Sequence, residues 1–222
     1  MTEGKWRPPS YHSTASSARW TTVLLAVSGL VGAASAVVAF LGHSIIARTV
    51  ATQDLAELDS WGAQVVRLGY LQITLLIATA LAFLVWEYRL VGNIPSLGGG
   101  TPRWSPAWSV IWWFVPVAFF VMPYVVMRDI TLRLAWTRSK PTRLVLAWWM
   151  AWVLSLITGQ VSNAVLSETG SLDTALNWLE VSSVTSVIAA ALAIRVVRRI
   201  QANAEKRTDR VGAGVAIERK RA

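Results

Sequence analysis

Residues 104–127 read WSPAWSVIWWFVPVAFFVMPYVVM, and the fold of the chain depends on whether this stretch crosses a membrane. The stretch has no charged residue, and its 24 residues are long enough as a helix to cross a hydrocarbon core of about 30 Å. However, Pro116 and Pro123 each lack an amide donor and disfavour helix in the residue before them, which predicts a break near the middle.

Tryptophans mark the beginning of the same stretch. Trp104, Trp108 and Trp112 recur every four residues and therefore share one helical face, and Trp113 follows directly. Tryptophan favours the headgroup level of a bilayer, where the ring is in an apolar layer and the indole N–H stays hydrated. We therefore expect a re-entrant or in-plane segment, although a kinked full span would also be long enough. The residues of this candidate re-entrant motif are Trp112, Trp113, Pro116 and Pro123.

Other stretches without charges identify the membrane-spanning helices. Residues 20–47, 68–86 and 144–167 match the length of a spanning helix, and residues 181–194 form a shorter run. A helix satisfies its backbone polar groups internally, as lipid requires. Only 15% of the residues are charged, against about a quarter in soluble domains. The sequence predicts an all-α membrane protein with four transmembrane helices plus the proline-broken segment; the alternative has five transmembrane helices.

The ends of the chain differ in composition from this membrane domain, which we expect over residues 20–200. Residues 1–19 contain Pro8-Pro9 and a run of small polar residues, which predicts a flexible basic cytoplasmic tail. Residues 201–222 form a second basic tail, and we expect it to be partly disordered near its glycines.

Basic residues predict the orientation, because the cytoplasmic flanks of membrane helices are enriched in Lys and Arg. If residues 104–127 enter and leave on one face, only Arg48 and Arg67 lie outside. The outer loops are then acidic, with Asp54, Glu57, Asp59, Glu168 and Asp173. Five crossings would move five basic residues outside, which fits the rule less well. We therefore expect a multi-pass plasma-membrane protein with both termini in the cytoplasm.

The net charge of +9 raises the question of a nucleic-acid partner. The basic residues flank apolar spans and do not form a stripe on a soluble domain, so we expect anionic lipids at the cytoplasmic face and no nucleic acid. Cysteine is absent, and no P-loop or nucleophile-base arrangement occurs in the sequence. His12 and His43 are expected to be solvated. We predict neither a catalytic residue nor a cofactor, and no metal site.

Several blocks of sequence resemble those of a known family. They are Trp86-Glu87-Tyr88-Arg89, Trp113-Phe114-Val115-Pro116-Val117, Arg128-Asp129 and Trp148-Trp149-Met150-Ala151-Trp152. The chain resembles domain-of-unknown-function family 4328, multi-pass membrane proteins found mainly in actinobacteria, over about residues 20–200. In that family an Asn commonly follows the first proline by three residues and an Arg precedes the second, whereas this chain has Phe119 and Met122 there. The resemblance implies a fold but no activity.

Small residues predict where two of the helices meet. In lipid, helices associate through close backbone approach at such residues. They recur every four positions on the first and last spans: Ser28, Gly32 and Ala36, and Ser182, Ser186 and Ala190. These two faces are candidates for a tight contact, although each helix has other possible neighbours.

Polar side chains towards the outer leaflet form a second candidate site. Ionisable residues within spans are costly and are often functional. The candidate polar cluster consists of Arg67, Gln72, Gln160, Asn163 and Glu180, with Asn177 nearby. Arg67 and Glu180 are near enough in predicted depth to pair, but both are also long enough to reach the headgroups.

Two classes of function fit the sequence. The first is a non-catalytic accessory or scaffold subunit that packs against other membrane proteins, which the 13 tryptophans and small-residue faces favour. The second is a small transporter, lipid-binding or sensing protein that uses the broken segment and the polar cluster. We expect the first, with the lipid bilayer and other membrane subunits as partners.

Overall fold

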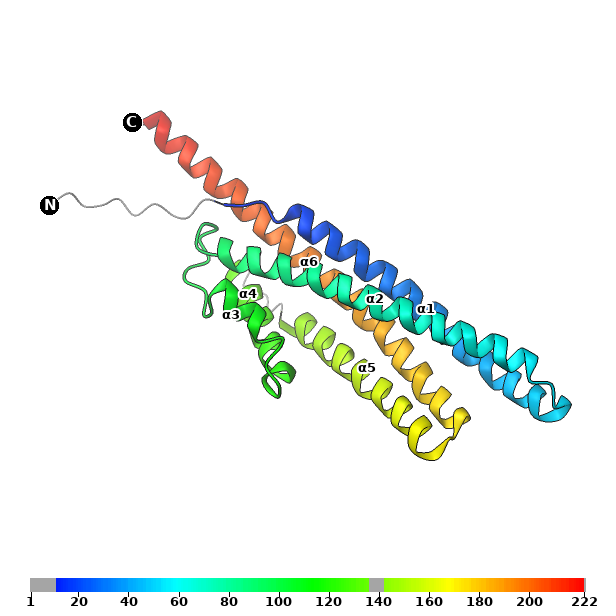
Figure 1. Cartoon of the computed structure of the whole chain (residues 1–222). Helices are drawn as coiled ribbons and strands as arrows, with labels where there is room; N and C mark the ends of the chain where they lie inside the picture. The colour runs from blue at the N-terminus through cyan, green and yellow to red at the C-terminus, as the bar shows by residue number, and fades with distance from the viewer. Residues whose placement is uncertain (1–10, 136–141, 222) are drawn as a thin grey trace. The chain divides into compact units, whose positions relative to one another are not determined.

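A computed structural model describes residues 11–135 and 142–221, with side chains described up to Val211. Its elements are α-helices and one short 3-10 helix (Figure 1). In chain order they are α1 (Ala15–Thr52), α2 (Ala56–Asn93), α3 (Pro106–Ile111), η1 (Ala118–Phe120), α4 (Met122–Leu134), α5 (Thr142–Thr169) and α6 (Leu172–Arg221). Four helices, namely α1, α2, α5 and α6, are long and apolar enough to cross a membrane. The prediction of an all-α membrane protein is confirmed.

The loops between the paired helices are short and locally stabilised. The Asp54 carboxylate accepts a hydrogen bond of 3.0 Å from the amide of Ala56, where α2 begins. Gly170, at φ +65°, ends α5 in the left-handed region that glycine adopts without steric cost. Each helix pair therefore reverses direction within a few residues.

The chain divides into two compact units. Unit 2 consists of residues 22–80 and 146–194 and contains the central parts of the four long helices. Its core includes Ala39, Ile45, Trp61 and Leu176. The Trp61 indole donates a hydrogen bond of 2.9 Å to the Val38 carbonyl, so α2 is tied to α1 at this core.

Small residues bring α1 and α6 together in unit 2, but only part of the two candidate faces takes part in the contact. A Cβ added at Gly29 would lie 3.4 Å from the Ala190 Cβ, and one at Gly32 would lie 3.3 Å from Val187. The predicted Ser28 instead contacts α2 through Thr79, and Ser182 donates to the carbonyl of Ser155 on α5. The hydroxyl groups therefore face neighbours that can hydrogen-bond, because a serine in lipid needs an acceptor.

Unit 1 consists of residues 1–21, 81–145 and 195–222. Its described core contains fully buried apolar side chains from α2, α4 and α6, with Trp86, Leu90, Met127, Ile130 and Ile200 among them. The Gln201 side-chain carbonyl accepts hydrogen bonds from Thr14 at 2.9 Å and from the Trp86 indole at 3.3 Å. The beginning of α1 and the end of α2 are thus tied to α6, and the predicted domain boundary at residue 200 falls inside this helix.

The predicted break in residues 104–127 is present between α3 and α4. The amide of Arg103, just before this run, donates a hydrogen bond of 3.4 Å to the Asp129 carboxylate, just after it. A straight helix of 24 residues would separate its ends by about 36 Å. The run therefore enters and leaves on the same side, and the alternative with five transmembrane helices does not fit.

Candidate functional site

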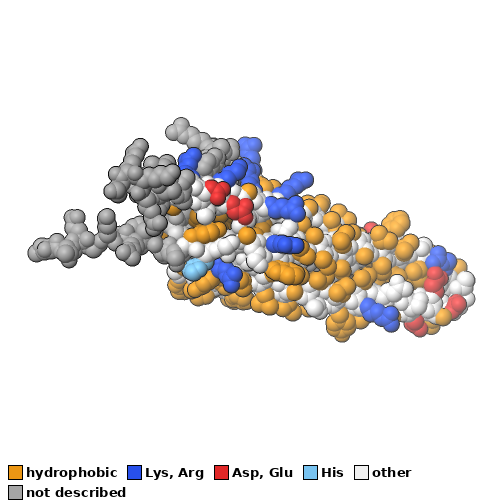
Figure 2. Space-filling view, turned by 90° about the horizontal axis from the view of Figure 1, so that it is seen from above, with side chains coloured by type: hydrophobic (Ala, Val, Ile, Leu, Met, Phe, Trp, Pro, Cys, Tyr) orange, Lys and Arg blue, Asp and Glu red, His pale blue; other side chains and the backbone are white. Residues whose placement is uncertain are grey.

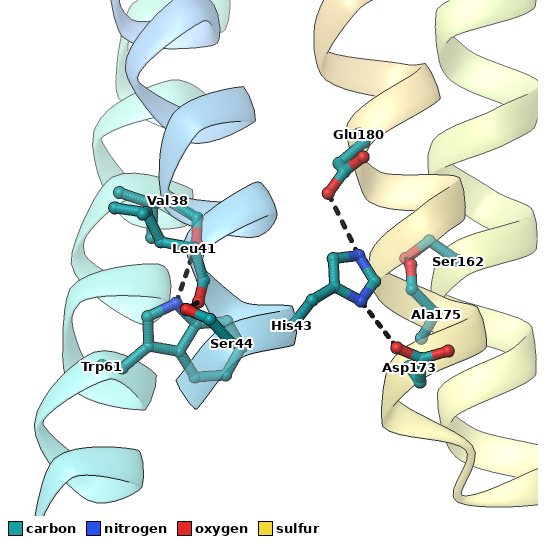
Figure 3. Close-up of polar contacts among 9 residues, drawn as sticks. All are labelled: Val38, Leu41, His43, Ser44, Trp61, Ser162, Asp173, Ala175 and Glu180. Carbon is teal, nitrogen blue, oxygen red and sulfur yellow. Dashed lines mark hydrogen bonds and ion pairs between the residues drawn. The ribbon is translucent and has the colours of Figure 1, made fainter. Parts of the chain in front are cut away.

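The most concentrated group of ionisable side chains in unit 2 joins α1 to α6. His43 lies between two carboxylates of α6, with Nδ1 2.6 Å from Asp173 and Nε2 3.1 Å from Glu180 (Figure 3). Asp173 and Glu180 are seven residues apart, which is two helical turns, so both face α1. Asp173 also lies in the first turn of α6, where the helix dipole favours a negative charge.

Each ring nitrogen of His43 faces a carboxylate oxygen of α6, so the ring contacts two turns of that helix at once. The side chain is only 29% exposed. The prediction that His43 is merely solvated is therefore wrong, because the ring links α1 to α6 within unit 2.

The residues of the predicted polar cluster do not all meet. Glu180 pairs with His43. No contact between Glu180 and Arg67 is present among the described residues, and the Arg67 side chain is exposed. Gln72 donates a hydrogen bond of 2.7 Å to Ser35 of α1. Gln160 and Asn163 are exposed on α5 and contact each other at 3.5 Å. The sequence did contain a sign of the group formed by His43, Asp173 and Glu180. The two acids are seven residues apart and so share one helical face, and a histidine lies at the end of another span.

The predicted re-entrant motif lies in unit 1, and its residues have different roles. Pro116 precedes a tight turn at Val117, and Pro123 is buried in the first turn of α4. The rings of Trp112 and Trp108 are 5.4 Å apart. Trp113 points to α2, where its indole donates a hydrogen bond of 2.9 Å to the Glu87 Oε2 atom.

Glu87 is a functional candidate that the sequence prediction missed. Its side chain is fully buried, and its Oε1 atom has no hydrogen-bond partner among the described residues. A buried carboxyl group is costly unless it is hydrogen-bonded, so the bond from Trp113 fixes where the broken segment lies on α2. The signal in the sequence was an acid directly after the end of the charge-free run 68–86, beside Trp86.

The described residues also limit which ligands are conceivable. They contain no group of three or more His, Asp and Glu side chains placed to hold a metal ion. A cavity of about 10 Å³ in unit 1, lined among others by Val91, Trp104 and Asp129, has the size of a single water molecule.

Comparison with known proteins identifies the family of the chain. No curated protein and no solved structure matches the chain. A family described as a domain of unknown function, DUF4328, matches residues 54–202, which begin just before α2 and end within α6 after Gln201. The match thus includes the broken segment and Glu87, and leaves α1 outside. Because it covers well over half of the chain, this protein belongs to the DUF4328 family.

Proposed function

We propose that this protein is a non-catalytic accessory or scaffold subunit that packs against other proteins of the plasma membrane. The observation that carries the proposal is how its buried and half-buried polar groups are used. Four of these groups join separate chain segments: Glu87 with Trp113, Gln201 with Thr14 and Trp86, Arg207 with Leu97 and Ala135, and His43 with Asp173 and Glu180. Such contacts stabilise a defined arrangement within each unit, which suits a protein that presents surfaces to partners.

The charges of the two units support cytoplasmic termini. Unit 2 has two arginines and six carboxylates, which give it a formal charge of −4. Since the whole chain has a net charge of +9, the rest of the chain has a formal charge of +13. On the face drawn in Figure 2, Lys and Arg side chains gather over unit 1, and hydrophobic side chains cover most of the long helices. Cationic flanks stay on the cytoplasmic side during insertion, and this supports a cytoplasmic location for the flanking residues of unit 1 and for both termini.

The orientation is tested with single cysteines, since the chain has none of its own. The variants Asp54→Cys, in the loop before α2, and Lys206→Cys, exposed on α6, are treated with a membrane-impermeant maleimide on intact cells. We expect labelling of Asp54→Cys at once and of Lys206→Cys only after the cells are permeabilised. The reverse pattern would reject cytoplasmic termini.

The accessory role is tested by extracting the tagged full chain in a mild detergent and weighing the intact particles by mass spectrometry. Stoichiometric partner chains support the proposal, whereas a lone chain that retains a small molecule contradicts it. A photoreactive phenylalanine analogue at Phe40, which is 69% exposed, should crosslink to the same partner. The analogue at Phe83, which is buried, is the matched control and should crosslink only within the chain.

A further inference from the structure

The described surface of unit 1 includes an apolar projection on the broken segment. Residues 112–121, which we call the wedge, run from the end of α3 through η1 to the beginning of α4. Four of its apolar side chains are exposed: Phe114 is 70% exposed, Val117 84%, and Phe120 and Val121 more than half. Exposed apolar groups in this density mark a surface that contacts something other than water.

The hydrogen bonds of the wedge indicate what that contact is. Seven of its nine amides donate to carbonyls within the broken segment, among them those of Trp113, Ala118 and Val121. Backbone groups in water need no such closure, because water itself accepts and donates. At the apolar boundary of a membrane such closure matters, because backbone groups without a partner are disfavoured as soon as water is excluded.

The backbone at Val117 is strained where it forms one of these internal hydrogen bonds. Its φ of +66° and ψ of −52°, with the amide of Ala118 donating to the Pro116 carbonyl at 2.7 Å, form a γ-turn of the rare, strained kind. A β-branched residue with positive φ is a strained outlier. The turn uses an internal acceptor where an aqueous loop would use water.

Contacts with α2 fix the depth of the wedge. The ring of Trp113 lies 5.5 Å from that of Phe83, and Phe83 is inside the charge-free run 68–86 of α2. One turn later on α2, Glu87 accepts the hydrogen bond from the Trp113 indole. The wedge therefore lies beside the last turns of a membrane-spanning stretch.

The base of the broken segment is charged, in contrast to the wedge. Arg103 covers the ring of Trp104, with its guanidinium carbon 4.8 Å from the ring centroid, and Arg128 is exposed on α4. Asp129, next to Arg128 in the chain, accepts hydrogen bonds from the amide of Arg103 and from the guanidinium of Arg133. Two arginines at the edge of an apolar projection match phosphate groups above acyl chains.

We propose that the wedge is inserted into the acyl chains of the leaflet next to unit 1, with Arg103 and Arg128 on the phosphates of anionic lipids, and that Glu87 is the positioning residue that holds its depth through Trp113. The occupant of the exposed apolar face is thus lipid. The inference does not depend on which proteins the chain assembles with, because it uses only contacts within unit 1.

The test uses the full chain with one cysteine, either Val117→Cys or the control Lys206→Cys, each carrying a nitroxide spin label. The protein is reconstituted into vesicles of phosphatidylcholine with phosphatidylglycerol, and relaxation by oxygen, which concentrates in lipid, is compared with relaxation by a water-soluble nickel chelate. At position 117 oxygen should dominate, and at position 206 the chelate should dominate. If the chelate dominates at 117, insertion is rejected; if neither reagent reaches 117, a second copy covers the wedge and the proposal is likewise overturned.

The role of Glu87 is tested in the same vesicles. Glu87→Gln retains an acceptor for the indole and should leave the label at 117 as deep as before. Glu87→Leu and Trp113→Phe each remove the hydrogen bond and should shift the label towards the chelate. Trp113→Phe keeps an aromatic ring against Phe83, so it reports on the bond even if Glu87→Leu fails to fold. If the label at 117 is equally deep in Trp113→Phe and in the parent, Glu87 has no positioning role.

The lipid headgroups are tested by changing the vesicles and the arginines. Omitting phosphatidylglycerol should make the label at 117 shallower in the parent, because the arginines then lose their anionic partners. The double variant Arg103→Gln/Arg128→Gln should show no such dependence on composition. If the label at 117 in the parent is equally deep in vesicles with and without phosphatidylglycerol, the contact with anionic lipid is rejected.

Discussion

Gly42 offers the sharpest test of how the helices of unit 2 pack. It lies on α1 against two other helices, and a Cβ built there would be 2.5 Å from the Cζ2 atom of Trp61 and 2.9 Å from Leu176. The Leu176 side chain can rotate away. The indole of Trp61 cannot do so freely, because it is buried and donates its hydrogen bond to the Val38 carbonyl.

The expected effect of Gly42→Ala follows from these contacts. Overpacking of this kind costs about 1–3 kcal/mol, and a double clash against a hydrogen-bonded ring belongs at the upper end. Replacing glycine by alanine within a helix returns about 1 kcal/mol. The net loss of about 2 kcal/mol should lower the thermal midpoint by about 4–8 °C for a chain of this length.

The assay is thermal unfolding of the detergent-purified full chain, read as the fraction that elutes at the native volume after each heating step. Gly69→Ala on α2 is the matched control, since a Cβ there meets nothing within 4 Å. Trp61→Leu removes the clashing ring, so the double variant should be more stable than the sum of the two single changes. Equal midpoints for Gly42→Ala and Gly69→Ala would show that Trp61 does not pack against α1 as described.

Three further predictions concern the polar contacts. Arg207→Gln removes donors to the carbonyls of Leu97, Gly98 and Ala135 and should lower the stability of this region by about 2 kcal/mol. The loss should appear as faster proteolysis of residues 94–105, and the control Lys206→Gln, at an exposed position, should not change that rate. Gln201→Leu leaves the buried donors of Thr14 and Trp86 without their acceptor and should lower stability by about 1–3 kcal/mol, whereas Ala202→Leu, on the exposed face, should have little effect on the thermal midpoint. Arg48→Ala breaks an exposed ion pair with Glu57, so its midpoint should equal that of the parent at low and at high salt; a drop only at low salt would show that this pair matters.

The helices were predictable because lipid imposes a simple requirement. The charge-free runs 20–47, 68–86 and 144–167 lie within α1, α2 and α5, and the run 181–194 lies within α6. The break between α3 and α4 was predictable as well, since a proline acts on its own neighbours in the chain. These features depend on local sequence, which a single chain displays.

The contacts between helices were less predictable, because they depend on rotation about the helix axis. Ser28 and Gly29 are one residue apart, yet one contacts α2 and the other α6. One residue corresponds to about 100° around the helix, so a four-residue repeat identifies a possible face but not its neighbour. The same uncertainty hid His43, whose two partners lie 130 and 137 residues away.

Glu87 and Glu180 show why acids near the ends of spans are difficult to interpret from sequence. Both lie beside a charge-free run, and the sequence placed Glu180 in the candidate polar cluster but left Glu87 out of it. In the structure Glu87 is the fully buried one, and the cause lies 26 residues away, where Pro116 and Pro123 turn the chain back so that Trp113 covers α2. An acid just past the end of a charge-free run is therefore exposed or buried according to what folds over it. Where a proline-broken apolar segment follows such an acid, burial is the better expectation, and the tryptophan nearest the break is the residue to test as its partner.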